Sequence, residues 1–358
     1  MKNKNLFILV SFFAILIVTF TGNALIINKP ELIEEKEDLY MSSTFTSSIV
    51  IDDLPGSLNN WSWAKSYGYC TGSGTKGSPY VIENHIFDNS LVFNGICLTI
   101  MNSQKYFIIR NCHFIGTQVN AGIQLYNVTN GIITKNSNSI DIYYSITVYN
   151  SSYNSITYNN FSKTSRTGIF FDGSYGDIRN NIISNNLLEE NVQCGIEFGS
   201  DCYFNEIYEN KILNNMIGIT LAGLNNNVSE NKIQYNDIGL GCVPSSNENT
   251  IYLNCFENST YYHAMDQGLF NKWDNGIKGN YWDNYTGPDA DENGIGDVPY
   301  NIYGSAGTQD NFPLMKCPLS AIREIPGYNI LIIFSLVSLI TFVSVYIAIK
   351  KKKLVSEL

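Results

Sequence analysis

The chain has 358 residues, of which 44% are hydrophobic and 13% aromatic, while only 15% are charged. Its formal net charge is −10. Binding to nucleic acid needs a basic surface that neutralises phosphates, so this acidic chain is predicted not to bind nucleic acid, and divalent cations suit it better as partners.

The first segment has the pattern of a secretory signal. Lys2 and Lys4 form a basic start, residues 6–20 are apolar, and small residues follow up to Ala24. We therefore interpret residues 1–24 as a signal peptide, with an uncleaved membrane anchor as the alternative. Residues 25–46 are mixed and acidic, and we interpret them as a spacer.

A short phrase then recurs: a small residue, an aliphatic residue, a variable residue and another apolar residue. An apolar residue at every second position is typical of a strand, and stacking such repeats buries their apolar positions in one continuous core. The repeat is too short for helical solenoids or propellers, and a β-sandwich would not keep one phrase in successive copies. The prediction is an all-β chain, a right-handed parallel β-helix of about seven recognisable rungs over residues 47–270, with caps. The copies begin at Gly95, Gly122, Ser145, Gly168, Gly195, Gly218 and Gly239.

The phrase also predicts which side chains point inward. The first inner column is Ile96, Ile123, Ile146, Ile169, Ile196, Ile219 and Leu240, and the second is Leu98, Leu125, Val148, Phe171, Phe198, Leu221 and Cys242. The outward column between them is Cys97, Gln124, Thr147, Phe170, Glu197, Thr220 and Gly241. A second phrase, with Asn160, Asn181, Asn210, Asn231 and Asn254, predicts corners whose Asn side chains form a hydrogen-bonded ladder.

Residues 271–314 are aromatic and rich in turn residues, and we interpret them as a C-terminal cap. Inside it, oxygen-bearing residues at alternate positions and Gly294 at the turn resemble a calcium loop. Position 12 of that loop is Tyr300 rather than Glu, so Asp310 is a candidate for the missing ligand. The alternative is a turn that bonds to itself. The predicted ligands are Asp289, Asp291, Asn293, the carbonyl of Ile295 and Asp297.

The opening residues 72–82, the Asn and Gly-Ile rungs and the closing residues 279–314 together resemble the NosD-like branch of the right-handed β-helix superfamily. That superfamily includes carbohydrate-binding proteins and sugar hydrolases. The resemblance implies an exported parallel β-helix. It does not imply one activity, since relatives include polysaccharide lyases, glycosidases, epimerases and a periplasmic protein linked to copper delivery.

The C-terminal region predicts attachment to a membrane. Residues 315–329 read as a stalk, and residues 330–349 are twenty uncharged residues, long enough to cross a bilayer. The Lys residues that begin the tail 350–358 favour the cytoplasmic side, which leaves the body outside the cell. Residues 325–329 resemble archaeal CTERM-type sorting signals, in which a peptidase removes the helix. Both alternatives place the protein at the cell surface.

Catalytic chemistry has weaker support. Hydrolysis of a glycosidic bond needs two carboxylates across a groove, and the candidates are Glu197 in the outward column and Asp172 one residue beyond the neighbouring phrase. A solvated face is the alternative. Exposed aromatic residues can also stack on sugar rings, with cross-rung packing as the alternative. These residues are Phe170, Tyr143, Tyr144, Tyr149, Tyr153 and Tyr158.

Copper would need clustered His, Cys or Met, yet His85, His113 and His263 are far apart in sequence and are expected on distant rungs. The eight Cys residues permit disulfides, and the pair Cys194–Cys202 is the first expectation. Seven Asn-X-Ser/Thr sequons allow glycosylation on the exterior, whereas that at Asn160 is expected inside the ladder.

Taken together, the sequence predicts a membrane-anchored surface protein that binds glycans or other surface components and is not an enzyme. A polysaccharide lyase or glycoside hydrolase acting near Asp172 and Glu197 is the first alternative, and a copper-related NosD-like protein is the second.

Overall fold

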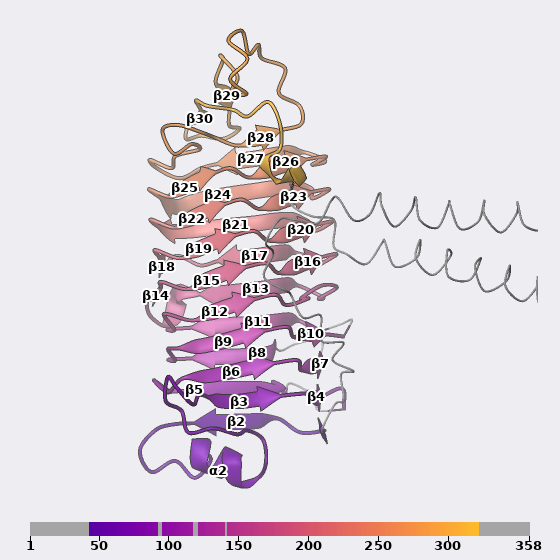
Figure 1. Cartoon of the computed structure of the whole chain (residues 1–358), viewed down its shortest axis with the longest axis vertical. Helices are drawn as coiled ribbons and strands as arrows, with labels where there is room; N and C mark the ends of the chain where they lie inside the picture. Colours follow the sequence, from indigo (N-terminus) through magenta and orange to yellow (C-terminus); the bar gives the residue numbers. More distant parts are fainter. Residues whose placement is uncertain (1–42, 92–94, 117–120, 140–141, 322–358) are drawn as a thin grey trace, which may run out of the picture. The chain divides into compact units, whose positions relative to one another are not determined.

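The computed structural model describes residues 43–321, except 92–94, 117–120 and 140–141. All of these residues belong to the second of two compact units, Met41–Leu358. In this part the chain winds into a right-handed parallel β-helix, so the predicted fold is confirmed. Most turns, or rungs, contribute one strand to each of three sheets (Figure 1).

The first sheet holds the Gly-Ile phrases, and its neighbouring strands are all parallel. Two short strands, β14 (Ile178–Arg179) and β18 (Cys202–Tyr203), extend it beyond β21. Its main strands are β2 (Ile49–Asp52), β5 (Leu98–Met101), β8 (Ala121–Tyr126), β11 (Tyr144–Tyr149), β13 (Thr167–Asp172), β17 (Cys194–Phe198), β21 (Ile217–Leu224), β24 (Ile238–Asn247) and β27 (Tyr262–Asp266).

The second sheet follows the first in each rung and has eight strands. They are β3 (Tyr80–Glu83), β6 (Phe107–Arg110), β9 (Gly131–Thr134), β12 (Ser155–Thr157), β15 (Ile182–Ser184), β19 (Glu206–Tyr208), β22 (Asn227–Ser229) and β25 (Thr250–Tyr252).

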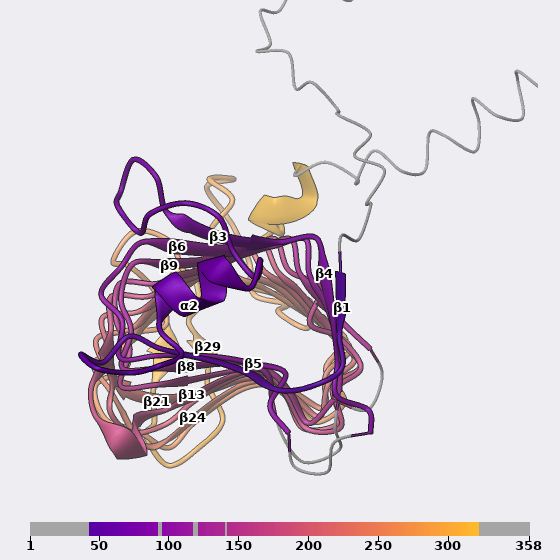
Figure 2. The ribbon, with the colours of Figure 1, turned by 90° about the horizontal axis from the view of Figure 1, so that it is seen from below.

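The third sheet closes each rung and comes in two parts, which Asn160 joins through bridges to Ser137 and Leu187. Viewed from below, the three sheets enclose the core (Figure 2). The strands are β1 (Ser43–Phe45), β4 (His85–Asp88), β7 (His113–Ile115), β10 (Ser137–Asn138), β16 (Leu187–Glu189), β20 (Lys211–Leu213), β23 (Lys232–Gln234), β26 (Cys255–Glu257) and β28 (Tyr281–Trp282).

The predicted inner columns are confirmed from the second copy of the phrase onward. Ile146 pairs with Ile123 on one side and with Ile169 on the other, and all three side chains are fully buried. In the second column, Phe171 stacks on Phe198 with ring centroids 4.8 Å apart. This continuous apolar column is the principal stabilising feature of the rod, because no single rung could bury it alone.

The first copy was assigned to the wrong register. Leu98 pairs with Ile123, and Ile100 pairs with Leu125, so the inner residues are Leu98 and Ile100 rather than Ile96 and Leu98. The outward residue is Thr99, while Cys97 is fully buried. The error has a simple cause: Cys97 is also a small residue, and the phrase that starts there fits the pattern as well as the one at Gly95.

Buried Asn side chains form ladders along the corners. In each step, the Oδ1 atom of one Asn accepts from both the backbone N–H and the Nδ2 group of the Asn one rung earlier. Asn186 makes both of these bonds to Asn210, each over 3.0 Å. The ladder between the second and third sheets comprises Asn136, Asn159, Asn186, Asn210, Asn231, Asn254 and Asn280. The ladder between the first and second sheets comprises Asn154, Asn181, Asn205, Asn226, Asn249 and Asn271.

The predicted Asn ladder is therefore confirmed in kind but not in membership. Asn181 belongs to a different corner from Asn210, and Asn160 is exposed because its neighbour Asn159 takes the ladder position. The sequon at Asn160 is thus on the exterior, contrary to the expectation.

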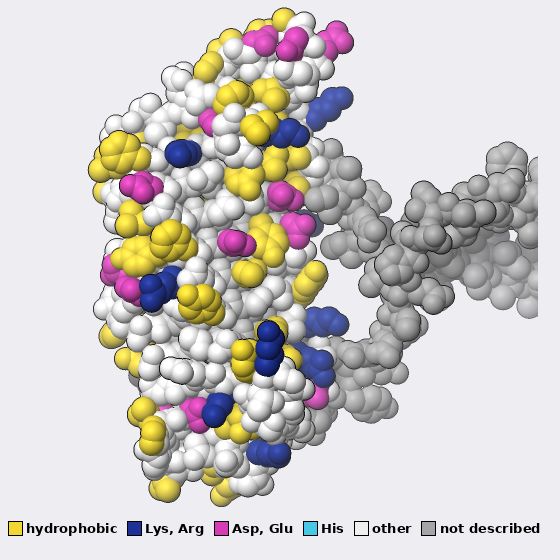
Figure 3. Space-filling view, turned by 60° about the vertical axis from the view of Figure 1, so that its left-hand side comes forward, with side chains coloured by type: hydrophobic (Ala, Val, Ile, Leu, Met, Phe, Trp, Pro, Cys, Tyr) yellow, Lys and Arg dark blue, Asp and Glu magenta, His cyan; other side chains and the backbone are white. Residues whose placement is uncertain are grey.

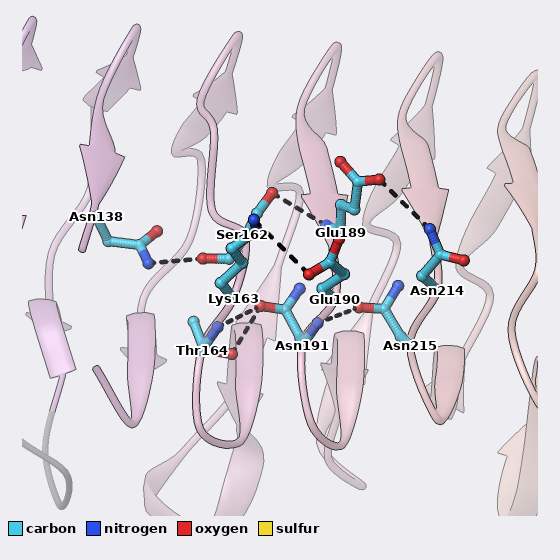
Figure 4. A network of polar contacts seen from close by, with 9 residues as sticks. All are labelled: Asn138, Ser162, Lys163, Thr164, Glu189, Glu190, Asn191, Asn214 and Asn215. Atoms are coloured by element: carbon cyan, nitrogen blue, oxygen red, sulfur yellow. Dashed lines mark hydrogen bonds and ion pairs between the residues drawn. The ribbon is translucent and has the colours of Figure 1, made fainter. Parts of the chain in front are cut away.

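A shorter series lies at the corner between the third and first sheets (Figure 4). Thr164 donates to Oδ1 of Asn191, whose own backbone N–H donates to Asn215 over 2.9 Å. Above it, Lys163 lies 3.7 Å from the carboxylate of Glu190 in an exposed ion pair. Such a pair contributes little, so the buried amides are the main polar stabilisers of this corner.

The residue before each ladder Asn has a positive φ, except Gly279 before Asn280, and many of these residues carry a full side chain. Glu209 has φ 54° and Tyr235 has φ 55°. The left-handed conformation costs an L-residue about 1–2 kcal/mol. The corner accepts this strain because the following Asn is fixed by its ladder hydrogen bonds.

Different structures close the two ends. At the start, α2 (Trp61–Ser66) buries Trp61, which stacks on Tyr80 at 4.5 Å. At the far end, Trp282 stacks on Phe256, and a short antiparallel pair, β29 (Tyr300–Asn301) with β30 (Gln309–Asp310), lies above (Figure 1).

The disulfide prediction was wrong. Cys255 of β26 is bonded to Cys317, and Cys194 and Cys202 are buried free thiols. Closeness along the coil misled the prediction, because Cys194 faces Thr220 on the next rung whereas the Sγ atom of Cys202 lies near the carbonyl of Phe171.

Several predicted segments lie outside the described residues: the signal peptide 1–24, almost all of the spacer 25–46, the part 322–329 of the stalk with its sorting-signal motif, residues 330–349 and the tail 350–358. Among the residues that the structure describes, no helix is long and apolar enough to cross a membrane.

Candidate functional site

Aromatic side chains gather on the outer face of the first sheet, across β8, β11 and β13. Strand alternation puts Phe170 on this face, because Ile169 and Phe171 on either side of it are fully buried. We call this surface the aromatic band. It comprises Tyr126, Tyr143, Tyr144, Tyr149, Arg166, Phe170 and Tyr175. Tyr175 is the last residue of the short 3-10 helix η1 (Gly173–Tyr175).

Arg166 organises one end of the band. Tyr144 stacks on Phe170 with ring centroids 5.1 Å apart, and Tyr143 meets Tyr144 edge-on at 4.8 Å. The Arg166 guanidinium lies 5.3 Å from the centroid of Tyr144, donates to its hydroxyl, and donates to Gln193 Oε1 over 2.7 Å. This arrangement presents a fixed cation beside aromatic faces.

The other end lies at the corner between the first and second sheets. Tyr149 contacts Tyr126 at 6.4 Å and Tyr175 at 5.4 Å, the latter edge-on. Tyr175 is 62% exposed. Burial raises the pKa values of Tyr144 and Tyr149, so both remain neutral phenols that can donate a hydrogen bond.

The structure brings together three of the predicted sugar-stacking tyrosines, Tyr143, Tyr144 and Tyr149, with Phe170. It separates Tyr153 and Tyr158, which occupy positive-φ corner positions on either side of the second sheet. Tyr126 and Tyr175 were missed. Tyr126 could have been found from the register of the repeat, since it pairs with Tyr149, whereas η1 is an insertion without a repeat signal.

Asp172 and Glu197 lie on adjacent strands but not opposite each other. Glu197 pairs with Phe170, which places Asp172 on a diagonal position two residues further along β13. The Glu197 Oε2 atom accepts from the hydroxyl of Thr167 at the start of β13, over 3.0 Å. The Asp172 Oδ1 atom accepts from the backbone N–H of Ser174 and caps η1, over 2.9 Å. The two carboxylates are thus engaged toward opposite ends of the strand.

Asp172 has another acidic neighbour that the sequence did not indicate. The backbone at Gly173 packs directly on Asp201, where an added Cβ atom would lie 2.5 Å from the Asp201 nitrogen. Asp201 accepts a hydrogen bond from the Tyr203 hydroxyl over 2.7 Å. Figure 3, turned so that the side of β14 and β18 comes forward, shows acidic and basic groups scattered among uncharged and hydrophobic side chains.

The acidic loop of the cap is exposed and bonds to itself. Asp289 accepts from the backbone N–H groups of Asn293 and Gly294, each over 3.0 Å, and Asp297 accepts from Ala290 over 2.8 Å. The other predicted side-chain ligands accept in the same way: Asp291 Oδ1 accepts from the backbone N–H of Asn293, and Asn293 Oδ1 accepts from the backbone N–H of Ile295.

Asp310 does not complete that loop. It is fully buried, and its carboxylate accepts from the Asn280 and Phe312 backbone N–H groups and from the Trp282 indole. The calcium assignment therefore has to stand on the five loop residues alone.

The three His residues do not form a copper site. His85 and His113 lie on the adjacent strands β4 and β7, closer than expected, but His85 points into the core and His113 points outward to Ser137. His263 contacts Asp283 at 2.7 Å. Burial lowers the pKa of all three imidazoles.

The thiols offer no alternative copper site. In the described part of the chain, the only group of three His, Cys, Asp or Glu side chains close enough to share an ion is Cys255, Glu257 and Cys317, and its two sulfurs are joined in the disulfide. Burial raises the pKa of the free thiols, to about 11 for Cys70 and about 12 for Cys97. The donor set of the described residues does not fit copper.

Comparison with solved structures finds other proteins with partial similarity. Pectate lyase Pel9A is 11% identical, with 77% of this chain and 79% of that chain covered and a TM-score of 0.45. The Dettilon tailspike protein is 16% identical, with a TM-score of 0.39, and the match covers 65% of this chain but 59% of the tailspike. A mutant of the periplasmic alginate epimerase AlgG is 14% identical, with a TM-score of 0.35, and the match covers 68% of this chain and 74% of that chain. We draw no functional argument from similarity at this level.

No curated protein sequence matches the chain. A family model described as "Periplasmic copper-binding protein (NosD)" matches residues 80–227 and 204–287. The two matches span the β-helix from its second sheet's first strand to the cap. Together they cover more than half of the chain, which therefore belongs to the NosD family.

Proposed function

We propose that this protein is an exported β-helix, displayed at the cell surface, that binds glycans through the aromatic band without converting them. The observation that carries the proposal is the Tyr144–Phe170 stack with the Arg166 guanidinium fixed against it. Aromatic faces stack on the apolar faces of sugar rings, and a fixed guanidinium donates to hydroxyl or carboxylate oxygens.

The band can be tested by substitution. Phe170→Ala removes the outward aromatic face while the buried column beneath it stays intact. The expected result is a loss of about two- to tenfold in glycan affinity, since an aromatic contact is worth about 0.5–1.5 kcal/mol. Tyr158→Ala is the matched control, because Tyr158 is exposed at a corner of the second sheet away from the band. A glycan array on the full chain, followed by calorimetry on the best ligand, gives the readout; equal losses in both variants would remove the band from binding.

Export and anchoring are parts of the same proposal. Residues 1–24 have a secretory pattern and residues 330–349 have the length of a membrane span. The Cys255–Cys317 disulfide supports an oxidising compartment. Protease treatment of intact cells is expected to digest the β-helix and leave only a C-terminal fragment in the membrane. Complete protection of the chain in intact cells would contradict this location.

A second candidate function is cleavage of a polysaccharide near Asp172 and Glu197, where Asp201 adds a third carboxyl group beside Gly173. Turnover would be detected by a reducing-end assay, or by the absorbance of unsaturated products, on the glycans that bind. A rate that disappears in Glu197→Gln while binding remains would establish the enzyme and replace the non-catalytic proposal.

A further inference from the structure

The last strand of the first sheet carries a histidine where the preceding rungs carry glycine. A Cβ atom added at Gly218 would lie 2.4 Å from the carbonyl oxygen of Gly239, and one added at Gly239 would lie 2.4 Å from that of His263. Among the described residues, no further strand of this sheet follows β27, so no carbonyl of a next strand excludes a side chain at His263. The end of the sheet therefore admits an imidazole at a position that is closed in the rungs before it.

Asp283 fixes the orientation of this imidazole. It directly follows β28, and its backbone N–H donates to the carbonyl of Phe256 over 3.1 Å. Its Oδ1 atom lies 2.7 Å from His263 Nε2, while its Oδ2 atom accepts from the backbone N–H of Asn258 over 2.6 Å. Burial lowers the pKa of His263, so its imidazole is neutral at neutral pH. A carboxylate only accepts, so the single ring proton is on Nε2, and Nδ1 is left as an acceptor.

Ser259 lies beside that acceptor. Its hydroxyl oxygen is 3.1 Å from His263 Nδ1, so the hydroxyl donates to the ring. Ser259 is partly buried, but its neighbours Asn258, Thr260 and Tyr261 are exposed, which places the hydroxyl on a turn that solvent reaches. In the described part of the chain, the backbone N–H of Ser259 has no hydrogen-bond partner. A free donor therefore lies next to the hydroxyl.

We propose that Ser259, His263 and Asp283 form a nucleophilic site that hydrolyses small carboxylic esters at the surface beneath the cap. A nucleophile within hydrogen-bond reach of a base, with the base oriented by a third group, is the arrangement that such catalysis needs. The free N–H of Ser259 gives one donor for the oxyanion. Esters suit a site with one such donor, because an alcohol leaves more readily than an amine.

The reaction needs only water as the second reactant. The Ser259 oxygen bonds to the acyl carbon while its proton passes to His263 Nδ1, and Asp283 stabilises the imidazolium through Nε2–H. The bond from the acyl carbon to the alcohol oxygen then breaks, and that oxygen takes the proton from Nδ1. A water molecule next gives a proton to Nδ1 and bonds to the acyl carbon, and the Ser259 oxygen leaves with that proton. One ester and one water thus give one acid and one alcohol.

This site is separate from the aromatic band, because its residues come from β27 and from turns near the cap, whereas the band lies on β8, β11 and β13. Its chemistry breaks acyl bonds and leaves glycosidic bonds intact. The inference therefore does not depend on what the band binds.

A fluorophosphonate and p-nitrophenyl acetate are the probes for an activated serine. The full chain is expected to hydrolyse the acetate at least about tenfold faster than Ser259→Ala, since positioned proton transfer alone contributes more than that. Mass spectrometry is expected to find the fluorophosphonate on Ser259. Ser245→Ala is the control, because Ser245 is an exposed serine of β24, and this variant should keep both the rate and the label. A wild-type chain without label or turnover, or a Ser259→Ala variant that retains both, would overturn the site.

Ser259→Cys distinguishes an activated nucleophile from a hydroxyl that only stabilises the turn. The native free thiols are buried, so iodoacetamide should react mainly with the introduced thiol. At about pH 6.5 we expect alkylation at least about tenfold faster than in Ser245→Cys, because His263 takes the thiol proton. Adding Asp283→Asn should remove most of this advantage at about pH 6.5 but not at about pH 10, where both thiols are ionised. Equal rates for Ser259→Cys and Ser245→Cys at about pH 6.5 would assign Ser259 to the turn alone and contradict the proposal.

Discussion

The backbone N–H of Asn280 donates to Oδ2 of Asp310 over 2.7 Å, and this bond ends the ladder that begins at Asn136. Each ladder amide points its Nδ2 group toward the C-terminal end, so the amide dipoles are aligned and their positive ends face the cap. A buried carboxylate at that end receives the last donors. The neighbouring ladder has the same termination, since Asn271 donates to Asp266 over 3.0 Å.

The cap should respond to pH through Asp310. Burial raises the pKa of this carboxyl from 3.8 to about 6, against the three N–H donors that favour its charged form. The folded state then binds more protons than the unfolded state between about pH 4 and pH 6. The contribution of Asp310 to the stability of the folded state is therefore complete below about pH 4 and falls as the pH rises to about 6.

Asp310→Asn removes this titration, so the difference in unfolding free energy between wild type and variant should change across pH 4–6 and be constant above pH 7. Denaturant unfolding at several pH values measures it. The two unfolding free energies must be subtracted because the lowered pKa values of His85, His113 and His263 make stability rise with pH in both proteins. The subtraction removes this shared effect. A difference that is flat from pH 4 to 7 would contradict the prediction.

Strain at the corners predicts a stabilising substitution. Tyr235 has φ 55° and is 54% exposed, so its side chain gains little from packing. Asn tolerates the left-handed conformation, and Tyr235→Asn should raise the unfolding free energy by about 1 kcal/mol. Tyr261→Asn is the matched control, since Tyr261 is also exposed but does not have a positive φ. Thermal melts measure the change in melting temperature of each variant relative to wild type. A similar change in the two variants would exclude backbone strain as the cause.

The disulfide should stabilise the cap substantially. Cys255 and Cys317 are 62 residues apart in sequence, and closing a loop of that size is worth about 4 kcal/mol in the chain-entropy model. Reduction, or Cys317→Ser, should lower the melting temperature and expose the cap to proteases. Cys194→Ser is the control. If the melting temperature of the reduced protein matched that of the oxidised one, the bond would have no stabilising role.

We further propose calcium binding by the acidic loop, with the five oxygen ligands replacing some of the loop's own hydrogen bonds. Calcium should then raise the melting temperature of the cap, and a chelator should lower it, with a reduced effect in Asp289→Asn. Glu292→Gln is the control, since Glu292 is in the loop but outside the ligand set. Melting curves unchanged by calcium would remove the site.

The periodic parts of the fold could be predicted from the sequence, and the aperiodic parts could not. Ile169 and Phe171 were assigned inward, and Phe170 outward, because strand alternation repeats from rung to rung. The register predicted for the first copy of the phrase was wrong because Cys97, like Gly95, is a small residue followed by an aliphatic one. The Cys255–Cys317 disulfide could not be predicted because it joins a rung to a segment beyond the cap, and no repeat relates the two.

The site was predictable to the same extent. Alternation placed Phe170 and Glu197 on one face, yet the guanidinium of Arg166 reaches the Tyr144 ring from outside the phrase. The separation of Asp172 from Glu197 depends on which backbone and hydroxyl groups each carboxylate accepts from. Those choices are made by side-chain torsions that residue spacing does not encode.

The Asn ladder also bears on how such a protein can change in length. Every internal Asn donates from Nδ2 to a backbone carbonyl of the rung before it and to Oδ1 of the Asn in the rung after it, as Asn186 does with Ile156 and Asn210. A duplicated rung would therefore meet the same chemistry on both sides. Asp266 and Asp310 accept from the last Asn of each ladder and pass no donor onward, so the two ladders end there. Whole turns could therefore be added within the ladders while the structures that close both ends stay unchanged.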